Sequence, residues 1–248
     1  KDISLNVKKG ECVLFTGKSG SGKSSIINSI NGLAVQYDGA SMGGTIRIDN
    51  KDIRNFKLYE ISILVSSVFQ NPKTHFFNIN TTLELLFYLE NIGLSKNQMD
   101  ERLNEMLELF PINHLLNRDI FKLSGGEKQI LCIAASYISG TEIIVLDEPS
   151  SNLDEDNIAI LKEMLIKLKD KGKTLIISEH RIFYLMDIVD RVFLIQVGKI
   201  QSEYTKADFM KIPSKVLNEL GLRSNTKTDL IVPKLQDDGS LMIKSIEL

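Results

Sequence analysis

Tryptophan is absent from the 248-residue sequence, and cysteine occurs only twice, at Cys12 and Cys132. Each cysteine lies among apolar neighbours, which indicates a buried thiol in a reducing compartment and argues against a disulfide-stapled chain. No stretch approaches the roughly 18 consecutive apolar residues of a membrane span. With 30 basic and 32 acidic side chains the net charge is −2, so no excess of positive charge points to a nucleic-acid partner.

The composition is that of a globular domain: 43% of the residues are hydrophobic and 25% are charged, which excludes a disordered or collagen-like chain. Short apolar runs alternate with segments of helical period, the pattern of an α/β domain. The predicted strands cover residues 11–17, 45–49, 61–69, 143–146 and 174–178, with a hairpin over 191–200 that turns near Gly198. Helices are predicted from the phosphate loop described below to Gly32, over 81–91 behind a capping box of Thr81 and Glu84, over 99–110, after Ser124, and over 158–168.

A glycine-rich loop follows the first predicted strand and opens the first predicted helix. Its sequence, Gly17-Lys-Ser-Gly-Ser-Gly22-Lys23-Ser24, fits the pattern G-x-x-x-x-G-K-[ST]. The glycines allow backbone N–H groups to curve around a polyphosphate, Lys23 suits the β- and γ-phosphates, and the Ser24 hydroxyl suits Mg²⁺. The alternative, a glycine-rich turn before an ordinary helix, is disfavoured by this context. We therefore predict a nucleoside triphosphate site at these residues: Gly17, Lys18, Ser19, Gly20, Ser21, Gly22, Lys23, Ser24 and Ser25.

A second apolar strand ends in Asp147-Glu148-Pro149. Carboxylates at the carboxyl end of such a strand are expected to lie beside the phosphate loop. Asp147 suits the Mg²⁺ shell, and Glu148 suits polarisation of an attacking water. Many strands end in acidic turns, so this motif alone is weak evidence for a site. Its occurrence together with a phosphate loop favours the functional interpretation.

Leu123-Ser-Gly-Gly-Glu-Lys-Gln129 precedes the acidic strand. Ser124 and Glu127 have capping-box spacing, which explains a helix start but not the two adjacent glycines. The sequence resembles the ATP-binding cassette (ABC) family, whose signature is Leu-Ser-Gly-Gly-Gln. That resemblance implies a P-loop NTPase core of α/β class, with a small antiparallel β region at the N-terminal side and a helical subdomain. It also implies that Ser124 and Gly126 bind ATP held by another cassette.

Further residues match the family in the expected order. Gln70 resembles the Q-loop glutamine, which senses Mg²⁺ and the membrane partner. Asp154, in Ser151-Asn-Leu-Asp154, resembles the D-loop aspartate at the dimer interface, and His180 resembles the switch histidine that contacts the γ-phosphate. Each residue has a plainer interpretation: a solvated glutamine, a structural histidine, and a helix-capping aspartate. Because all the motifs occur in the family's order, the functional interpretation of these three residues is favoured.

Within the family, the residues after Gln70 and the segment Ser-Glu-His-Arg-Ile around His180 resemble the ATPases of energy-coupling factor transporters, which import vitamins and transition-metal ions. The sequence differs from the family's usual pattern at three points. Glu127 replaces the signature's glutamine, Ile130 replaces a frequent arginine, and no aromatic residue between Lys1 and Glu11 is available to stack on adenine.

The resemblance predicts an ABC ATPase domain over residues 1–200, with its helical subdomain over about 71–139, and a C-terminal extension over 201–248. Residues 241–248 resemble the opening strand of another cassette. Two alternatives follow: the first half of a tandem two-cassette ATPase, or a single-cassette subunit with a small C-terminal region.

The function implied is hydrolysis of Mg²⁺-bound ATP that powers a transporter. The expected partners are a second ABC cassette and an integral membrane subunit, with no nucleic acid. The expected location is the cytoplasmic face of the cell membrane. The competing class is a soluble ABC ATPase that acts on ribosomes or DNA, but the sequence has neither a long coiled coil nor a long basic linker. A catalytically silent cassette is disfavoured by the intact Lys23, Asp147, Glu148 and His180.

Overall fold

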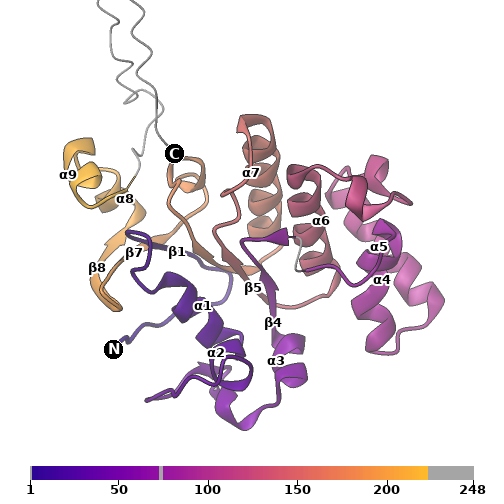
Figure 1. The fold of residues 1–248 in the computed structure, drawn as a ribbon, viewed down its shortest axis with the longest axis horizontal. Coiled ribbons are helices and arrows are strands. Elements are labelled where there is room, and N and C mark those ends of the chain that lie inside the picture. Colours follow the sequence, from indigo (N-terminus) through magenta and orange to yellow (C-terminus); the bar gives the residue numbers. More distant parts are fainter. Residues whose placement is uncertain (1, 73–74, 223–248) are drawn as a thin grey trace, which may run out of the picture.

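A computed structural model describes residues 2–72 and 75–222. Its main sheet has six strands in the order β4-β5-β6-β1-β7-β8, and a two-stranded sheet pairs β2 with β3 (Figure 1). The strands are β1 Cys12–Thr16, β2 Arg47–Ile48, β3 Lys51–Asp52, β4 Val65–Val68, β5 Ile143–Asp147, β6 Thr174–Ser178, β7 Arg191–Gln196 and β8 Lys199–Thr205. The α-helices are α1 Lys23–Ile30, α2 Leu33–Gln36, α3 Leu58–Leu64, α4 Thr81–Asn91, α5 Lys96–Leu109, α6 Gly125–Ile138, α7 Glu155–Asp170, α8 Lys206–Phe209 and α9 Ser214–Glu219. Short 3₁₀ turns cover Ile53–Asn55, Asn113–Leu115, Ile120–Lys122 and Phe183–Leu185.

The five strands from β4 to β7 in this order pair in parallel, and β8 is the antiparallel edge. Parallel strands buried on both faces are expected to be continuously apolar, and β1 is buried along its whole length. Because the strands are parallel, the carboxyl ends of β1, β5 and β6 meet at one edge of the sheet. The phosphate loop, Asp147 and His180 all follow these three strands, so the topology brings them together.

Side chains of β1 alternate between two hydrophobic layers. Cys12 and Leu14 join the larger cluster, to which α6 and α7 contribute, whereas Val13 and Phe15 join the cluster that includes α1. Figure 1 shows α1 and α3 on one side of the sheet and α6 and α7 on the other. Both cysteines are free and buried, as predicted, and burial raises the pKa of the Cys12 thiol to about 12. The predicted α/β class is confirmed.

Three predicted elements need correction. The strand predicted over 61–69 is a helix, α3, followed by the four-residue β4. Glu60 accepts a hydrogen bond from the Lys57 N–H and stabilises the first turn of α3, while Ile61 packs against the backbone of Gly32. The strand predicted over 45–49 is only the two residues of β2, which form a tight hairpin with β3.

The third correction concerns the start of α4. Its N-cap is Asn80, whose side chain accepts from the N–H groups of Thr82 and Leu83. Thr81 instead donates its hydroxyl to the Leu115 carbonyl, and Glu84 accepts from the N–H groups that precede the helix. The predicted helix exists, but the Thr81–Glu84 capping box does not.

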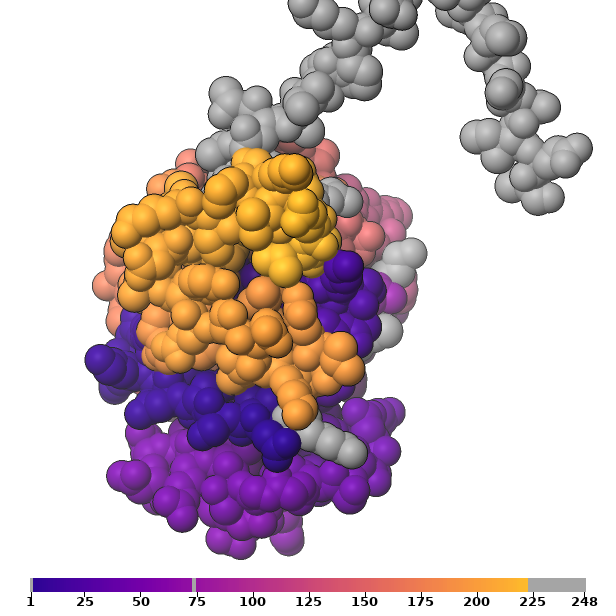
Figure 2. Space-filling view, turned by 90° about the vertical axis from the view of Figure 1, so that its left-hand side faces the viewer, coloured from indigo at the N-terminus to yellow at the C-terminus, as the bar shows by residue number. Residues whose placement is uncertain are grey.

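Helices α4, α5 and α6 pack on one another beside the sheet, within the range predicted for a helical subdomain (Figure 1). At the other end of the sheet, α8 and α9 follow β8, and Phe209, Leu217 and Leu222 are buried in the larger cluster. Figure 2 shows α8 and α9, coloured orange to yellow, at the top of one face. The domain boundary at 200 stays a prediction; β8 runs across it, and the strand proposed for 241–248 lies outside the described residues.

Candidate functional site

The phosphate loop joins β1 to α1 through three glycines with positive φ: 147° at Gly17, 74° at Gly20 and 102° at Gly22. A Cβ at Gly17 would lie 2.1 Å from the carbonyl oxygen of Ile195, so β7 leaves no room for a side chain there. The Ser21 N–H donates to the Lys18 carbonyl over 3.1 Å and closes the turn. The loop thus has the backbone freedom and close packing that a phosphate-binding turn requires.

Lys23 is 3% exposed, and its ammonium is directed back into the loop. Its Nζ donates to the carbonyl oxygens of Gly17 at 3.1 Å and Lys18 at 3.3 Å. Burial lowers the pKa of this ammonium below its ordinary value, while the carboxylates of Glu148 and Asp147 oppose that change. The loop therefore holds a buried cation close to two carboxylates.

The two carboxylates occupy different positions at the end of β5. Asp147 accepts the Ser178 hydroxyl, which fixes its side chain against the end of β6. Glu148 has a φ of 46°, in the left-handed region that non-glycine residues rarely adopt. Its N–H donates to the Ser178 carbonyl at 2.9 Å, and its own carbonyl accepts from Ser151 at 3.1 Å. These backbone bonds hold the strained residue in place.

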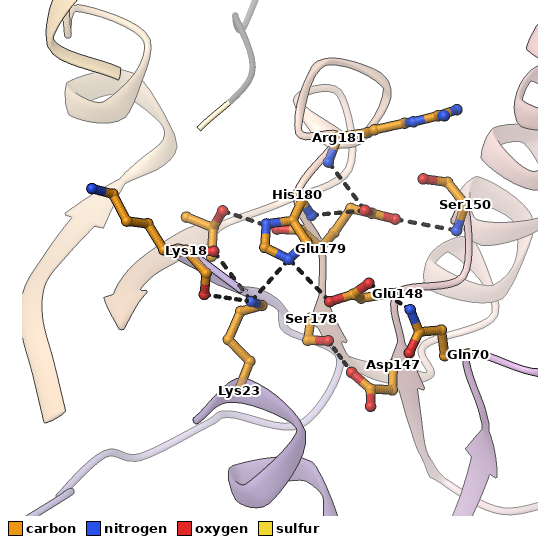
Figure 3. A network of polar contacts seen from close by, with 12 residues as sticks. Lys18, Lys23, Gln70, Asp147, Glu148, Ser150, Ser178, Glu179, His180 and Arg181 are labelled. Atoms are coloured by element: carbon orange, nitrogen blue, oxygen red, sulfur yellow. Dashed lines mark hydrogen bonds and ion pairs between the residues drawn. The ribbon is translucent and has the colours of Figure 1, made fainter. Parts of the chain in front are cut away.

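Four of the predicted site residues form one network of polar contacts (Figure 3). Gln70 donates its amide to one oxygen of Glu148 at 2.9 Å, and the other oxygen lies 3.0 Å from His180 Nε2. The same Nε2 is 3.2 Å from Lys23 Nζ. Since one ring nitrogen either donates or accepts, His180 can donate to Glu148 or accept from Lys23, but it cannot do both at once.

The signature residues lie elsewhere, at the start of α6. Ser124 caps the helix by accepting from the Glu127 N–H at 3.2 Å, and Glu127 accepts in return from the Ser124 N–H at 2.7 Å. Arg118 donates to the second oxygen of Glu127 at 2.7 Å. These contacts lower the pKa of the Glu127 carboxyl, the hydrogen bond from the Ser124 backbone most of all. Among the described residues, Ser124 bonds to Glu127 and, through its carbonyl, to the Lys128 N–H at 3.0 Å, and not to the phosphate loop.

Gly126 and Asp154 both lie against Asn157, near the starts of α6 and α7. Asp154 caps α7 by accepting from the backbone N–H and the side-chain amide of Asn157, at 2.9 and 2.8 Å. A Cβ on Gly126 would lie 2.3 Å from the side-chain amide carbon of Asn157. The capping interpretation of Asp154 is therefore correct, and its exposed position leaves the interface role open.

The residues of the sheet edge fit a nucleotide and its metal ion. The hydroxyl oxygen of Ser21 is buried in the phosphate loop and has no hydrogen-bond partner within the part of the chain that the structure describes. The same residues contain no group of three His, Cys, Asp or Glu side chains able to hold a metal by themselves. Mg²⁺ at nucleotide sites needs only one or two protein oxygens together with the phosphates, a role that Ser24 and Asp147 suit.

Comparison with known proteins agrees with this geometry. Residues 1–151, more than half of the chain, match the ABC transporter family. The chain belongs to the ABC transporter family. It is an ATP-binding cassette, the ATPase unit of such transporters.

Two relatives illustrate how far the similarity extends. A protein of Treponema denticola, provisionally named an ABC transporter ATP-binding protein, is 42% identical over 229 residues, which are 92% of this chain and 47% of that protein. One of the same description from Sulfurisphaera tokodaii is 34% identical over 98% of this chain and 50% of its own length. The cassette thus spans about half the length of the curated relatives it matches.

Solved structures with the same fold include CbiO1 of Clostridium perfringens, described as part of the ABC transporter complex CbiONQ. It has a TM-score of 0.76 and 25% identity, over 88% of this chain and 86% of CbiO1. A dimeric ATP-binding cassette bound to ADP and inorganic phosphate has a TM-score of 0.71 and 27% identity, over 83% of this chain and 90% of that one. No helix among the described residues of this cassette has the length and apolar character needed to cross a membrane.

Sequence reasoning missed several residues that shape the site. Glu179 is 2% exposed and bonds both to the residues after it and to the loop after Glu148. Ser178 holds Asp147, and Arg118 holds Glu127. Glu179 stands within the segment Ser-Glu-His that resembles energy-coupling factor ATPases, which was the only available signal. The other two contacts join distant parts of the chain and leave no local pattern.

Proposed function

We propose that this cassette binds Mg²⁺-ATP at its phosphate loop and hydrolyses it with Glu148 as the general base. The observation that carries the proposal is the position of the Glu148 carboxylate, held between Gln70 and His180 and beside the buried Lys23. A carboxylate so placed can accept the proton of a water that attacks the γ-phosphate. His180 and Lys23, which lie 3.2 Å apart beside Glu148, would donate to the γ-phosphate.

The remaining loop residues would hold the polyphosphate. Backbone N–H groups of the phosphate loop and of the first turn of α1 would donate to the phosphates, and the start of α1 adds favourable partial positive charge. Ser24, Asp147 and Gln70 would hold Mg²⁺, which when bound neutralises charge on the phosphates. Asp147 is already oriented by Ser178, so its carboxylate needs little reorganisation.

The signature residues would serve a second cassette. Among the described residues, Ser124 bonds within the α6 cap and not to its own phosphate loop, and it is exposed at a helix start that can bind a phosphate. Asp154 is likewise exposed at the start of α7. ATP would be sandwiched between the phosphate loop of one cassette and the signature of the other, whether a separate subunit or another part of a longer chain.

The energy of this cycle would drive import of a small solute such as a vitamin or a metal ion. The resemblance of the Gln70 and His180 segments to energy-coupling factor ATPases supports this choice, as does the structural likeness to CbiO1. The cassette would then sit against an integral membrane subunit at the cytoplasmic face of the membrane.

Two measurements on the purified chain and one on its native assembly test the proposal. Calorimetry should detect ATP binding that weakens when EDTA removes Mg²⁺, and phosphate release should require both ATP and Mg²⁺. Purification of the tagged protein from its own membranes should retain a membrane transporter subunit in stoichiometric amount. Stoichiometric recovery with ribosomes or DNA instead would contradict the transport assignment while leaving the ATPase intact.

A further inference from the structure

A buried carboxylate beside the site takes no direct part in the chemistry described above. Glu179 follows β6 and is 2% exposed, and its carboxylate accepts four hydrogen bonds. One oxygen accepts from the N–H groups of His180 at 2.7 Å and Arg181 at 3.0 Å. The other accepts from the Ser150 N–H at 3.2 Å and the Tyr184 hydroxyl at 3.1 Å. Burying a carboxylate is costly unless it is hydrogen-bonded, and here every partner is a donor.

These bonds do more than cap a turn. Capping the exit of β6 needs only the bonds to His180 and Arg181, yet the second oxygen reaches a different element, the loop after β5. Ser150 in that loop is two residues after Glu148 (Figure 3). Glu179 thus joins the segment that carries the switch histidine to the segment that carries the proposed base.

The backbone of Glu179 is tied to a third element of the site. Its N–H donates to the Phe15 carbonyl at 3.0 Å, and its carbonyl accepts the Thr16 hydroxyl at 2.9 Å. Both residues end β1, directly before the phosphate loop. The carboxyl ends of β1, β5 and β6 are therefore connected through one residue.

We propose that Glu179 is a positioning residue of the ATPase reaction, whose carboxylate fixes the His180 ring relative to Glu148. The proposal rests on the function proposed above. The contact at stake is the 3.0 Å approach of His180 Nε2 to Glu148, and displacements of about 1 Å in such constellations can cost about a hundredfold in rate.

Glu179→Gln tests the idea because it keeps the shape and replaces one acceptor oxygen by a donor. Whichever oxygen is replaced faces two donors, so two of the four bonds are lost. We expect kcat to fall about ten- to hundredfold while KM for ATP changes less than about threefold. The matched control is Glu11→Gln. Glu11 is also a buried carboxylate, bonded to the Lys8 N–H and Arg191, but it lies at the opposite end of β1. That control should keep its kcat.

Two further variants separate positioning from general loss of stability. In a His180→Ala background, adding Glu179→Gln should lower kcat by less than about threefold, because the group it positions is already gone. Glu179→Asp keeps the charge but retracts it by one methylene, and should show an intermediate kcat. Thermal unfolding shows whether Glu179→Gln folds. If it does not, Glu179→Asp is used for the kinetic test in its place.

A readout independent of hydrolysis keeps the inference apart from the proposed function. The chain has three histidines, so their ring signals can be assigned by NMR with His180→Ala. Glu179→Gln should move the His180 signals and leave those of His75 and His114 in place. Wild-type protein without ATPase activity would refute the proposed function, yet the NMR result would still decide on Glu179. Two results would overturn the positioning role. One is that the His180 signals do not move in Glu179→Gln; the other is that Glu179→Gln lowers kcat in the His180→Ala background by as large a factor as it does in wild type.

Discussion

The phosphate-loop edge (residues 17–25 with Asp147, Glu148 and His180) and the signature turn (residues 124–127) both include a helix start. Their polar groups differ in how their hydrogen bonds are satisfied. At the edge, His180 Nε2 lies 3.2 Å from the Lys23 ammonium and 3.0 Å from the Glu148 carboxylate, two partners that require different states of one nitrogen. At the signature turn, Ser124 and Glu127 satisfy each other and Arg118 completes the set. The phosphate-loop edge therefore has two contacts that compete for one nitrogen, whereas the side chains of the signature turn have mutually compatible hydrogen bonds.

This difference indicates how each region meets a phosphate. The edge groups contact one another through bonds that a triphosphate would replace, and Lys23 already has a pKa lowered by burial. The signature turn has no internal conflict, so it can present a preformed helix start to an incoming phosphate. We therefore expect changes at the edge to alter chemistry and binding, and changes at the turn to alter mainly stability and partner contact.

The largest expected effect is at the base. Glu148→Gln keeps the shape of the side chain but removes its ability to take a proton, and positioned general bases contribute about 10²–10⁴-fold. We expect kcat to fall by that factor, while ATP binding persists and an ATP-bound dimer accumulates. Phosphate release and size-exclusion chromatography with ATP measure these outcomes, with the exposed Glu163→Gln on α7 as a control. A kcat equal to that of wild type would exclude Glu148 as the base.

The second effect concerns binding. Lys23→Ala removes a buried charge that faces the phosphates, and charge-assisted hydrogen bonds contribute roughly 1.5–3 kcal/mol. We expect the Kd for ATP, measured by calorimetry, to rise about ten- to hundredfold. Lys96→Ala, at the exposed first position of α5, should leave the affinity unchanged. Equal affinities in the two variants would refute the phosphate-loop assignment.

The smallest effect concerns the Glu127 carboxylate in the signature turn, and it depends on pH. Contacts in the folded state lower the Glu127 pKa, so they stabilise the fold fully above the ordinary value of about 4.5. That stabilisation is lost as the pH falls through the lowered folded-state pKa. Glu127→Gln preserves the capping box but not the ion pair with Arg118. We expect it to reduce the free energy of unfolding by a few tenths to about 1 kcal/mol near pH 7.

Urea unfolding of both proteins from pH 7 to pH 3 checks this expectation. The difference between wild type and Glu127→Gln should stay constant down to about pH 5 and then shrink. A difference that persists unchanged at pH 3 would show that the charge of Glu127 has no part in the stability of the turn.

Much of this architecture could be predicted from the sequence because its signals are local. The run before Gly17 and the one before Asp147 are short, apolar and bounded by turn residues, which is enough to identify buried parallel strands. The prediction of a strand over 61–69 was wrong because it, too, used only a short local pattern. The segment Ile61-Ser-Ile-Leu-Val65 is mostly apolar and contains three β-branched residues, and so short a run can form either a helix or a strand. Only the capping contact of Glu60 and the packing on Gly32 decide it.

The candidate site divides in the same way. Lys23, Asp147 and His180 follow strands that a parallel sheet must bring to one edge, so their proximity could be predicted. The bond from Glu179 to Ser150 joins residues 29 positions apart, and the one from Arg118 to Glu127 depends on the path of the intervening turn. No periodicity encodes such contacts, which arise from tertiary packing alone.

The central claim is that the phosphate-loop edge and the signature turn of one chain belong to two different ATP sites. Ser124→Arg places bulk and positive charge at the turn, and should block the closed dimer while leaving the monomer's affinity for ATP intact. Lys23→Ala damages the edge. In either homodimer both composite sites then carry a lesion, so neither variant alone should hydrolyse ATP.

Mixing the two variants is the most direct test. If the signature acts on the partner's nucleotide, the mixed dimer has one site with both lesions and one site with none, and ATPase activity should reappear when two inactive proteins are combined. If the signature acted on its own chain's nucleotide, every site in the mixture would keep one lesion. Restored phosphate release is the result this account predicts, and a mixture as inactive as its two components would contradict it.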